Sequence, residues 1–581
     1  MIIQSLVEFY NLLSTDKEID IPRLGYSIVK VKLVAIISGK GELLDIVPLT
    51  DNPKSFENMI VPEQTVRSGS KISPYFLWDK SEYVFGWSFD KKPYTAKFNY
   101  FSAFKKLHEE ILKGLDNKKA QALLAFLENW KTDEALNNDV IKSKQDILEK
   151  YNGNIVFRID GELGYLHEDE EILAQWERYY NQQFLKEGSL GQCLVNGVED
   201  IIERVHPKIT GVKGTNSAGA SLISFNDDAY ESYNKKQSFN SPIGKKAAFS
   251  YASALNFMVN NERHKIIIED FTLVFWANKK SGKHENLFQE LLSPGTVKSE
   301  NNYQVSAVEY VRDSINALTQ GKNIEKDENI TFNILGLTPS NARVSVRLWL
   351  KDNFGDIVNR VWQHQQDMEI IKSDTYKGNI SIYRLLSETI PKKSKNEKIS
   401  ASLTSNLLES ILKGDNYPIG MYVAILNRVK IEKDVNYIRV GFIKAYLLRK
   451  ARKNNKETEG VITVSLNEQN TNIPYRLGRL FAVLEKAQLD AADGKINSTI
   501  KDRYFASATS SPRTVFPVLM RLAQHHIAKD EYGYWKDDKI KEILQGIDVL
   551  PAHLNLEDQG LFILGYYHQK EAFYQKSKKS E

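Results

Sequence analysis

The sequence predicts an α+β N-terminal part with mixed and antiparallel strands, followed by an all-α C-terminal helical bundle. Up to about residue 390, runs of β-branched and aromatic residues alternate with helical stretches. Beyond that point, apolar residues recur almost throughout with the 3.6-residue period of a helix. The charged stretch PKKSKNEK separates the mixed strand-and-helix pattern from the helical pattern and is typical of a linker. We therefore predict domains at 1–390 and 399–581, joined by a linker at 391–398.

The N-terminal part is expected to begin with a helix at 3–13, where MIIQSLVEFYNLL places apolar residues on one helical face. Residues 26–37 and 43–49 are β-rich and flank the turn SGKG, which predicts a hairpin. YVFGW, from Tyr83, is expected to be a strand, and NIVFRIDGELGYL, from Asn154, a strand followed by a turn. Helical spacing predicts the helices at 101–130, broken near Gly114, and at 169–180.

The middle of the chain is expected to return to strands after a polar loop. Residues 222–225 are expected to form a strand, 265–277 a buried strand or hairpin, and 330–350 a hairpin. Ser241 followed by Pro242 matches the first positions of a helix, with serine as the N-cap. Asp352 is expected to begin a further helix that runs to Gln366.

The C-terminal part is expected to be a helical bundle, because its apolar period stays close to that of a helix. The predicted helices cover 401–413, 419–430, 434–453, 475–492, 512–528, 537–545 and 558–575.

Composition places the chain among ordinary globular proteins. It has 581 residues, 42% of them hydrophobic and 26% charged, which favours about two to four domains. The net charge of +4 is too small to indicate nucleic-acid binding by itself. The single cysteine, Cys193, excludes a disulfide within the chain and is expected to be a small buried apolar residue. Neither a secretory signal nor an apolar run long enough for a membrane span is evident, so we expect a cytoplasmic protein without membrane contact.

A polar loop at 206–221 carries the most unusual motif. GTNSAGAS, residues 214–221, has the glycine spacing of a phosphate-binding loop, but Ala220 stands where the lysine belongs. We therefore expect no ATP or GTP there. Hydrogen-bonding side chains on a glycine-rich backbone suit the grooves and phosphates of nucleic acid, and a plain surface loop is the alternative. The residues that would act in this way are Lys208, Lys213, Thr215, Asn216 and Ser217.

A second polar loop, VRSGSKISP, begins at Val66 and has the same character. We predict that Arg67, Ser70 and Lys71 contact DNA together with the 206–221 loop. Because the choice rests on residue chemistry and loop position, it does not say which residue reads which base.

The sequence offers no convincing catalytic or metal-binding group of residues. His167 is followed by acids, but Glu171 stands where the second histidine of a zinc protease motif would be. His525 and His526 are adjacent, so on a helix they point in different directions. We therefore predict a non-enzymatic protein without cofactor or metal.

Basic residues gather on the predicted C-terminal helices. Arginine on a helical bundle suits contacts with a phosphate backbone, and a solvated helix face is the alternative. The predicted DNA-backbone residues are Lys444, Arg449, Lys450, Arg452, Lys453, Arg476, Arg479, Arg503, Arg513 and Arg521.

Several segments in constant order suggest a family. They include IIQSLVEFYNLL, HPKITGVKGTNSAGASLISFNDDAYESY, DFTLVFWA, GLTPSNARVSVRLW, VNYIRVGFIKAYL and NTNIPYRLGRLFAVLEKAQ. Together they resemble the large subunit of the type I-C CRISPR Cascade complex, the Csd family. The resemblance implies a non-catalytic subunit that recognises the protospacer-adjacent motif (PAM) in duplex DNA, promotes unwinding and R-loop formation, and recruits a helicase–nuclease. In such complexes guide pairing reads the target sequence, while protein reads the short duplex motif.

The resemblance also implies partners: crRNA, target double-stranded DNA, the Cascade backbone subunits, the crRNA-processing subunit, small subunits and the helicase–nuclease. In this family the C-terminal helices are also made separately as the small subunit, here residues 461–581 or a product from Met421. An internal start would use Met421 or a non-AUG codon at Val461 or Val464. A metal-dependent nuclease or other nucleic-acid enzyme, and a purely structural scaffold, are the alternatives.

Overall fold

The computed structural model describes residues 2–16, 19–63, 67, 72–280, 282–295, 305–322, 330–373, 376, 378–394, 396–455, 460–492, 496–529 and 533–578. The chain divides into two compact units. Unit 1 comprises Met1–Pro207 and Ile223–Phe257, and unit 2 comprises Lys208–Leu222 and Met258–Glu581.

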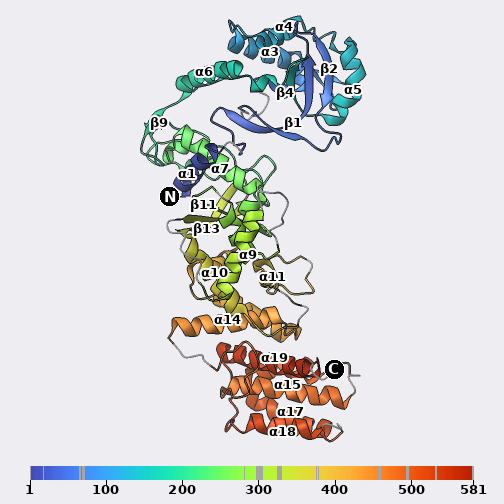
Figure 1. Ribbon diagram of the computed structural model, residues 1–581, viewed down its shortest axis with the longest axis vertical. Helices are drawn as coiled ribbons and strands as arrows, with labels where there is room; N and C mark the ends of the chain where they lie inside the picture. Colours follow the sequence, from blue (N-terminus) through green and yellow to red (C-terminus); the bar gives the residue numbers. More distant parts are fainter. Residues whose placement is uncertain are drawn as a thin grey trace. The chain divides into compact units, whose positions relative to one another are not determined.

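Unit 1 is built on a sheet with the strand order β2-β1-β7-β4, with β3 pairing to the first half of β1 (Figure 1). β1 pairs antiparallel with β2 and β3 but parallel with β7, so the sheet is mixed. The strands of unit 1 are β1 (Tyr26–Ile37), β2 (Leu43–Pro48), β3 (Glu57–Pro62), β4 (Trp78–Lys80), β5 (Trp87–Ser88), β6 (Thr95–Ala96), β7 (Asn154–Ile159), β8 (Leu190–Gln192) and β9 (Glu199–Ile201).

Burial along β1 follows its place in the sheet. Its first half alternates between buried and exposed residues, whereas Leu33–Ile37 is buried throughout. This second half lies between β2 and β7, and helices α4 and α5 pack on β1 and β2. A strand covered on both faces needs a continuous apolar run, which the sequence LVAII provides.

The helices of unit 1 are α1 (Ile2–Ser14), α2 (Ser81–Val84), α3 (Phe98–Leu112), α4 (Lys118–Asn129), α5 (Asp139–Tyr151), α6 (Glu170–Glu187) and α7 (Lys245–Asn260), the last of which ends in unit 2. Short 3-10 turns lie at Ala135–Asn137, Leu166–Glu168, Asp228–Tyr230, Gln237–Asn240 and, in unit 2, Glu262–His264.

Unit 2 begins with an antiparallel sheet in the order β10-β11-β12-β13. Its strands are β10 (Lys265–Ile268), β11 (Phe271–Ala277), β12 (Thr331–Ser340) and β13 (Arg343–Asn353). β11 is buried at every position, and helix α8 packs on it, while α10 and α12 pack on β13. The fold class predicted from the sequence is therefore confirmed for the strand-containing part of the chain.

The rest of unit 2 is helical. Figure 1 shows α15, α17, α18 and α19 side by side, and α15 packs against each of the other three. The helices are α8 (Lys283–Leu292), α9 (Val305–Thr319), α10 (Phe354–Met368), α11 (Ile382–Ser387), α12 (Ala401–Lys413), α13 (Ile419–Glu432), α14 (Tyr437–Lys453), α15 (Ile473–Ala491), α16 (Ile500–Ser510), α17 (Pro512–Ile527), α18 (Gly533–Leu544) and α19 (Leu556–Lys578). The predicted C-terminal helical bundle is thus confirmed.

One hydrophobic core runs from the sheet of unit 2 into its last helix, from Ile268 to Tyr567. Helix α19 lies so close to α13 and α14 that a Cβ atom at Gly560 would be 2.1 Å from the hydroxyl of Tyr422. That hydroxyl donates to the carbonyl of Leu556 at 2.9 Å, so it cannot simply swing away. The contact requires glycine at position 560.

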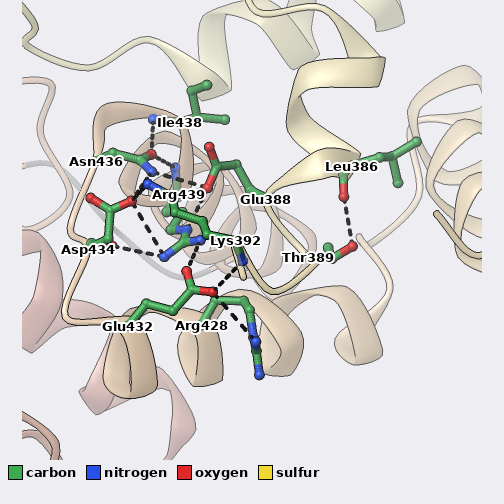
Figure 2. A network of polar contacts seen from close by, with 10 residues as sticks. All are labelled: Leu386, Glu388, Thr389, Lys392, Arg428, Glu432, Asp434, Asn436, Ile438 and Arg439. Atoms are coloured by element: carbon green, nitrogen blue, oxygen red, sulfur yellow. Dashed lines mark hydrogen bonds and ion pairs between the residues drawn. The ribbon is translucent and has the colours of Figure 1, made fainter. Parts of the chain in front are cut away.

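A network around Arg439 ties the segment after α11 to α13 and α14 (Figure 2). The Arg439 side chain is fully buried and contacts Glu388 at 2.6 Å and Glu432 at 2.5 Å. Lys392 donates its backbone N–H to Glu432 at 3.0 Å and pairs with Asp434 at 2.5 Å. Burial opposes ionisation of Glu432, but hydrogen bonds from Lys392 and Arg439 outweigh it and lower the pKa of this carboxyl. The start of the predicted linker at 391–398 is thereby held against α13, and the domain boundary drawn there stays a prediction.

Several local expectations were wrong. Tyr83 and Val84 belong to the short helix α2 and are buried, so packing overrides the β-propensity of YVFGW. Residues 222–225 form no strand. Helix α7 begins at Lys245 rather than after Ser241. The helices α5, α8, α9, α11 and α16 were not anticipated.

Candidate nucleic-acid interface

The loop between His206 and Leu222 has a defined structure. Ile209 and Ala220 exchange two backbone hydrogen bonds, of 2.8 and 2.9 Å, which close the loop at its base. Both residues and Val212 are buried, with 2% exposure or less. Buried apolar residues at the base therefore fix the polar residues at the tip in one orientation.

The tip of this loop presents three of the predicted contact residues. Lys213, Asn216 and Ser217 are exposed, and the Asn216 carbonyl accepts the N–H of Gly219 at 2.9 Å in a tight turn. The side chains of Asn216 and Ser217 form no hydrogen bond within the described residues, so both can bind a ligand. Thr215 differs, because its half-buried hydroxyl donates to the Val212 carbonyl at 2.8 Å and braces the turn.

Close packing explains part of the glycine content of the loop. Gly214 has a φ of 84°, and a Cβ atom there would lie 2.9 Å from the ring of Pro339 at the end of β12. A side chain at this position would be both strained and obstructed. Gly214 is thus explained by its contact with the β12–β13 hairpin, and Gly219, with a φ of 82°, by the Ile209 carbonyl oxygen, which would lie 2.8 Å from a Cβ atom there.

The same hairpin adds basic residues that sequence reasoning missed. Ser221 donates to the Ala342 carbonyl and accepts from the Val344 N–H, each at 3.0 Å. This pairing places Arg343 beside the loop, and exposed Arg347 lies four residues along the same strand. The 120 residues or so between loop and hairpin hide this proximity in the sequence, although the two segments were both among those that suggested the family.

The second predicted loop gives a different picture. Arg67 pairs with buried Asp79, donates to the Ser73 carbonyl at 2.7 Å, and lies over the Tyr75 and Tyr83 rings. Burial raises the pKa of Asp79 to about 6, although the Arg67 guanidinium works against that rise. In this conformation Arg67 braces unit 1. Ser70 and Lys71 lie outside the described residues.

Three of the cations predicted to contact the DNA backbone are buried in unit 2. Arg449 is 3% exposed and lies over the Tyr417 ring, 3.5 Å from Asp367. Arg479 is 1% exposed and bonds to Gln569 and Glu542, each at 3.1 Å. Burial lowers the pKa of Lys444 to about 8. These side chains cannot reach a phosphate in the described conformation.

Four further cations have partners but lie nearer the surface. Lys450 pairs with Glu557, and Arg452 pairs with Asp367 at 2.7 Å. Lys453 lies 3.7 Å from Asp415, and half-buried Arg476 donates to the Asn470 carbonyl at 2.7 Å. Only Arg452 and Lys453 among them are exposed.

Three predicted arginines are exposed on adjacent helices. Arg503 lies on α16, and Arg513 and Arg521 lie on α17, which packs against α16. Arg513 donates to the Leu550 carbonyl at 3.0 Å. Arg503 and Arg521 have no hydrogen-bond or ion-pair partner within the described residues, so both guanidinium groups are available to an anion.

The histidines serve the fold in every case where their contacts are described. His108 is fully buried, accepts the Leu77 N–H on Nε2 at 2.8 Å, and contacts the Phe104 carbonyl through Nδ1 at 2.8 Å. Burial lowers its pKa to about 4, with the Phe104 carbonyl opposing the shift. Among the described residues, no group of three or more His, Cys, Asp or Glu side chains is placed to hold a metal ion. Cys193 is buried, as predicted.

Comparison with known families identifies the chain. The model of the CRISPR-associated protein family Cas_Csd1 matches residues 6–574. The chain belongs to the Cas_Csd1 family. No curated protein matches it with significance. Within the described part of the chain, no helix is long and apolar enough to cross a membrane. The family resemblance inferred from the sequence is thus confirmed, and this Csd1 chain is a CRISPR-associated protein.

Proposed function

We propose that this chain is the large subunit of a type I-C CRISPR surveillance complex. In that role it recognises the PAM in duplex DNA, promotes R-loop formation and recruits a helicase–nuclease. The observation that carries the proposal is the braced loop at 208–221, presented by a chain whose family match covers residues 6–574. The partners are those implied by the family: crRNA, backbone and crRNA-processing subunits, small subunits and the helicase–nuclease.

The geometry of the loop suits reading of a duplex. Asparagine offers a donor and an acceptor together, which match adenine in the major groove, and serine hydroxyls match any base edge. Exposed Lys213 and Arg347, together with neighbouring Arg343, supply positive charge for the phosphates on either side. A preorganised loop favours specificity, because its side chains do not need to be ordered on binding.

The test uses the assembled complex and duplexes that differ only in the motif. We expect Asn216→Ala to weaken binding of correct-motif DNA by about 1–3 kcal/mol and to leave wrong-motif DNA unaffected. Ser217→Ala should act in the same direction. Asn11→Ala, at an exposed asparagine on α1, is the matched control. Unchanged motif discrimination in both loop variants would contradict the assignment.

We also propose that the chain has no active site of its own, which separates this function from a nuclease. Support comes from the missing lysine at Ala220 and from the absence of a three-residue metal cluster among the described residues. Purified chain should cleave neither ATP nor DNA with Mg²⁺ or Mn²⁺. Hydrolysis that one substitution in this chain abolishes would overturn the proposal.

The C-terminal helices are proposed to occur also as a separate small subunit. Helices α15–α19 pack on one another, which supports a free domain. A product from Met421 would retain most of α13 and all of α14, whereas one from Val461 would leave the α19 surface around Gly560 open. Intact-mass analysis of the purified complex should give two products ending at Glu581. Full-length chain alone, in a protease-deficient host, would exclude separate production.

A further inference from the structure

Unit 1 carries an exposed aromatic residue in a conformation that is rare for its type. Tyr233 is 96% exposed and has a φ of 52°, and Asn234 follows with a φ of 57°. They are the two central residues of a turn in which Lys235 donates its N–H to the Ser232 carbonyl at 3.0 Å. Two consecutive positive φ angles define the type I′ class, where Asn, Asp and Gly are usual and a bulky ring is an outlier.

The turn is held firmly in place by Asn240. The Asn240 side chain accepts the Ser232 N–H at 2.8 Å and donates to the carbonyls of Lys235 and Gln237, at 2.6 and 2.9 Å. Gln237 in turn accepts a hydrogen bond from Arg204 at 2.7 Å. A strained residue persists only where its surroundings determine its conformation, and such residues cluster at functional sites.

The charge beside the ring favours nucleic acid as its partner. Lys235 and Lys236 follow the turn directly and are exposed, without an ion-pair partner in the described part of the chain. Three acids lie nearby in the sequence: Asp227 and Asp228 are exposed at the preceding 3-10 turn, where the Asp227 carboxylate accepts the N–H of Ala229 at 3.0 Å, and Glu231 is half-buried. The two lysines are the charged residues that follow the ring directly. A flat exposed ring with two adjacent cations matches the pairing of a stacked base with its flanking phosphates.

We propose that Tyr233 is a stacking platform for an unpaired nucleobase, with Lys235 and Lys236 on the adjoining phosphates. The inference rests on the proposed nucleic-acid function and adds a contact with an unpaired strand. The ligand is an unpaired base, which the displaced DNA strand and the guide RNA both contain. Stacking tolerates every base, so this site would hold a strand without reading its sequence.

The test exploits the strain at Tyr233. Glycine removes the ring and accepts a positive φ, so Tyr233→Gly should weaken binding of single-stranded oligonucleotide by full-length protein about tenfold. Its thermal unfolding temperature should be no lower than that of the unaltered protein. Tyr233→Phe should bind normally because it keeps the ring. Tyr534→Ala, at another exposed tyrosine, is the matched control and should change nothing.

Separate arms use single-stranded DNA, single-stranded RNA and blunt duplex DNA. A loss confined to the DNA or to the RNA arm supports the proposal and identifies the strand, and blunt duplex binding should be unchanged. Photocrosslinking to 5-iododeoxyuridine in the DNA, or to 5-iodouridine in the RNA, should label the peptide that contains Tyr233.

Three outcomes would overturn the proposal. The first is that Tyr233→Gly binds single-stranded oligonucleotide as tightly as the unaltered protein. The second is that Tyr233→Phe loses as much affinity as Tyr233→Gly. The third is that the cross-links map to peptides that do not contain Tyr233. If Tyr233→Gly binds nucleic acid normally but no longer copurifies with partner subunits, the ring contacts protein and the stacking assignment is wrong. Failure of the unaltered complex to bind any motif-bearing duplex would instead reject the proposed function itself.

Discussion

The loop at 208–221 and helix α14 show how differently the same kind of residue can be used. Both segments carry residues predicted to bind DNA: two lysines among polar residues in the loop, and lysines and arginines in α14. In the loop, Lys213 is exposed at a braced tip, whereas in α14 Lys444 and Arg449 are buried. The difference lies in what surrounds the cation: a cation on a polar loop faces solvent, while one on a helix surface packed against the core must find a partner inside.

The largest expected effect on stability comes from a buried cation of α14. Arg439→Ala should lower the free energy of unfolding by about 3 kcal/mol, because it removes a fully buried guanidinium and leaves the half-buried carboxylates of Glu388 and Glu432 without it (Figure 2). Urea denaturation measures the change. Arg503→Ala, at an exposed arginine, should stay within about 0.5 kcal/mol of the unaltered protein. Equal stability of the two variants would show that burial of the Arg439 guanidinium does not set its contribution to stability.

A second large effect concerns acid sensitivity. Neutral His108 is required for the hydrogen bond from Leu77, and its pKa is about 4, against about 6.5 in an unfolded chain. As the pH falls below about 6.5, the unfolded state takes up a proton that the folded state does not, so stability falls until the pH nears 4. The loss from His108 is on the order of 3 kcal/mol.

Urea unfolding across this pH range tests the histidine contribution. His108→Gln should make the dependence of stability on pH shallower by about one proton. Gln524→Ala replaces an exposed residue that does not titrate and should leave the slope as it is. An unaltered slope in His108→Gln would mean that burial of this ring does not govern its protonation.

An intermediate effect is expected where the loop contacts the β12–β13 hairpin. Gly214→Ala places a methyl group against Pro339 at a positive φ and should cost about 1 kcal/mol or more. Hydrogen exchange at the Ala220 amide, which bonds to Ile209, should become faster. Gly39→Ala is the control, since a Cβ there meets nothing within 4 Å. Unchanged exchange at Ala220 would show that the loop does not depend on this contact.

The smallest effect on stability belongs to the exposed arginines of α16 and α17. Arg503→Ala and Arg521→Ala should leave stability within about 0.5 kcal/mol. If each contacts a phosphate, each should reduce the log–log salt slope of DNA binding by about 0.7–0.9. Lys450→Ala should leave that slope unchanged, because Lys450 is paired with Glu557. If Lys450→Ala reduced the salt slope and the two arginine variants did not, the DNA contact would lie on α14 instead.

Periodicity predicted most of the helical part because helices are local. The ranges 401–413 and 419–430 match α12 and α13 closely. The parallel pairing of β1 with β7 was beyond such reasoning, since more than a hundred residues separate the strands and no local rule joins them. The strand prediction for YVFGW failed because burial of Tyr83, which is a tertiary effect, decided the conformation of this segment.

The candidate site was predictable only in part. The polar tip at Asn216 and Ser217 followed from composition, whereas Arg343 required the tertiary pairing with Ser221. One signal was available and unused: between Tyr437 and Leu447, α14 has no polar face, so a cation inside that stretch was bound to be internal. Counting charged residues without regard to the apolar residues around them overestimates the extent of a binding surface.

The close approach at Gly560 bears on how this gene can evolve. In the full-length chain, position 560 must stay glycine for α19 to pack beside Tyr422. A short product beginning at Val461 would lack Tyr422 and would tolerate alanine there. If both products come from one reading frame, selection on this codon acts through the longer product alone, and a Gly560→Ala allele would separate their roles genetically.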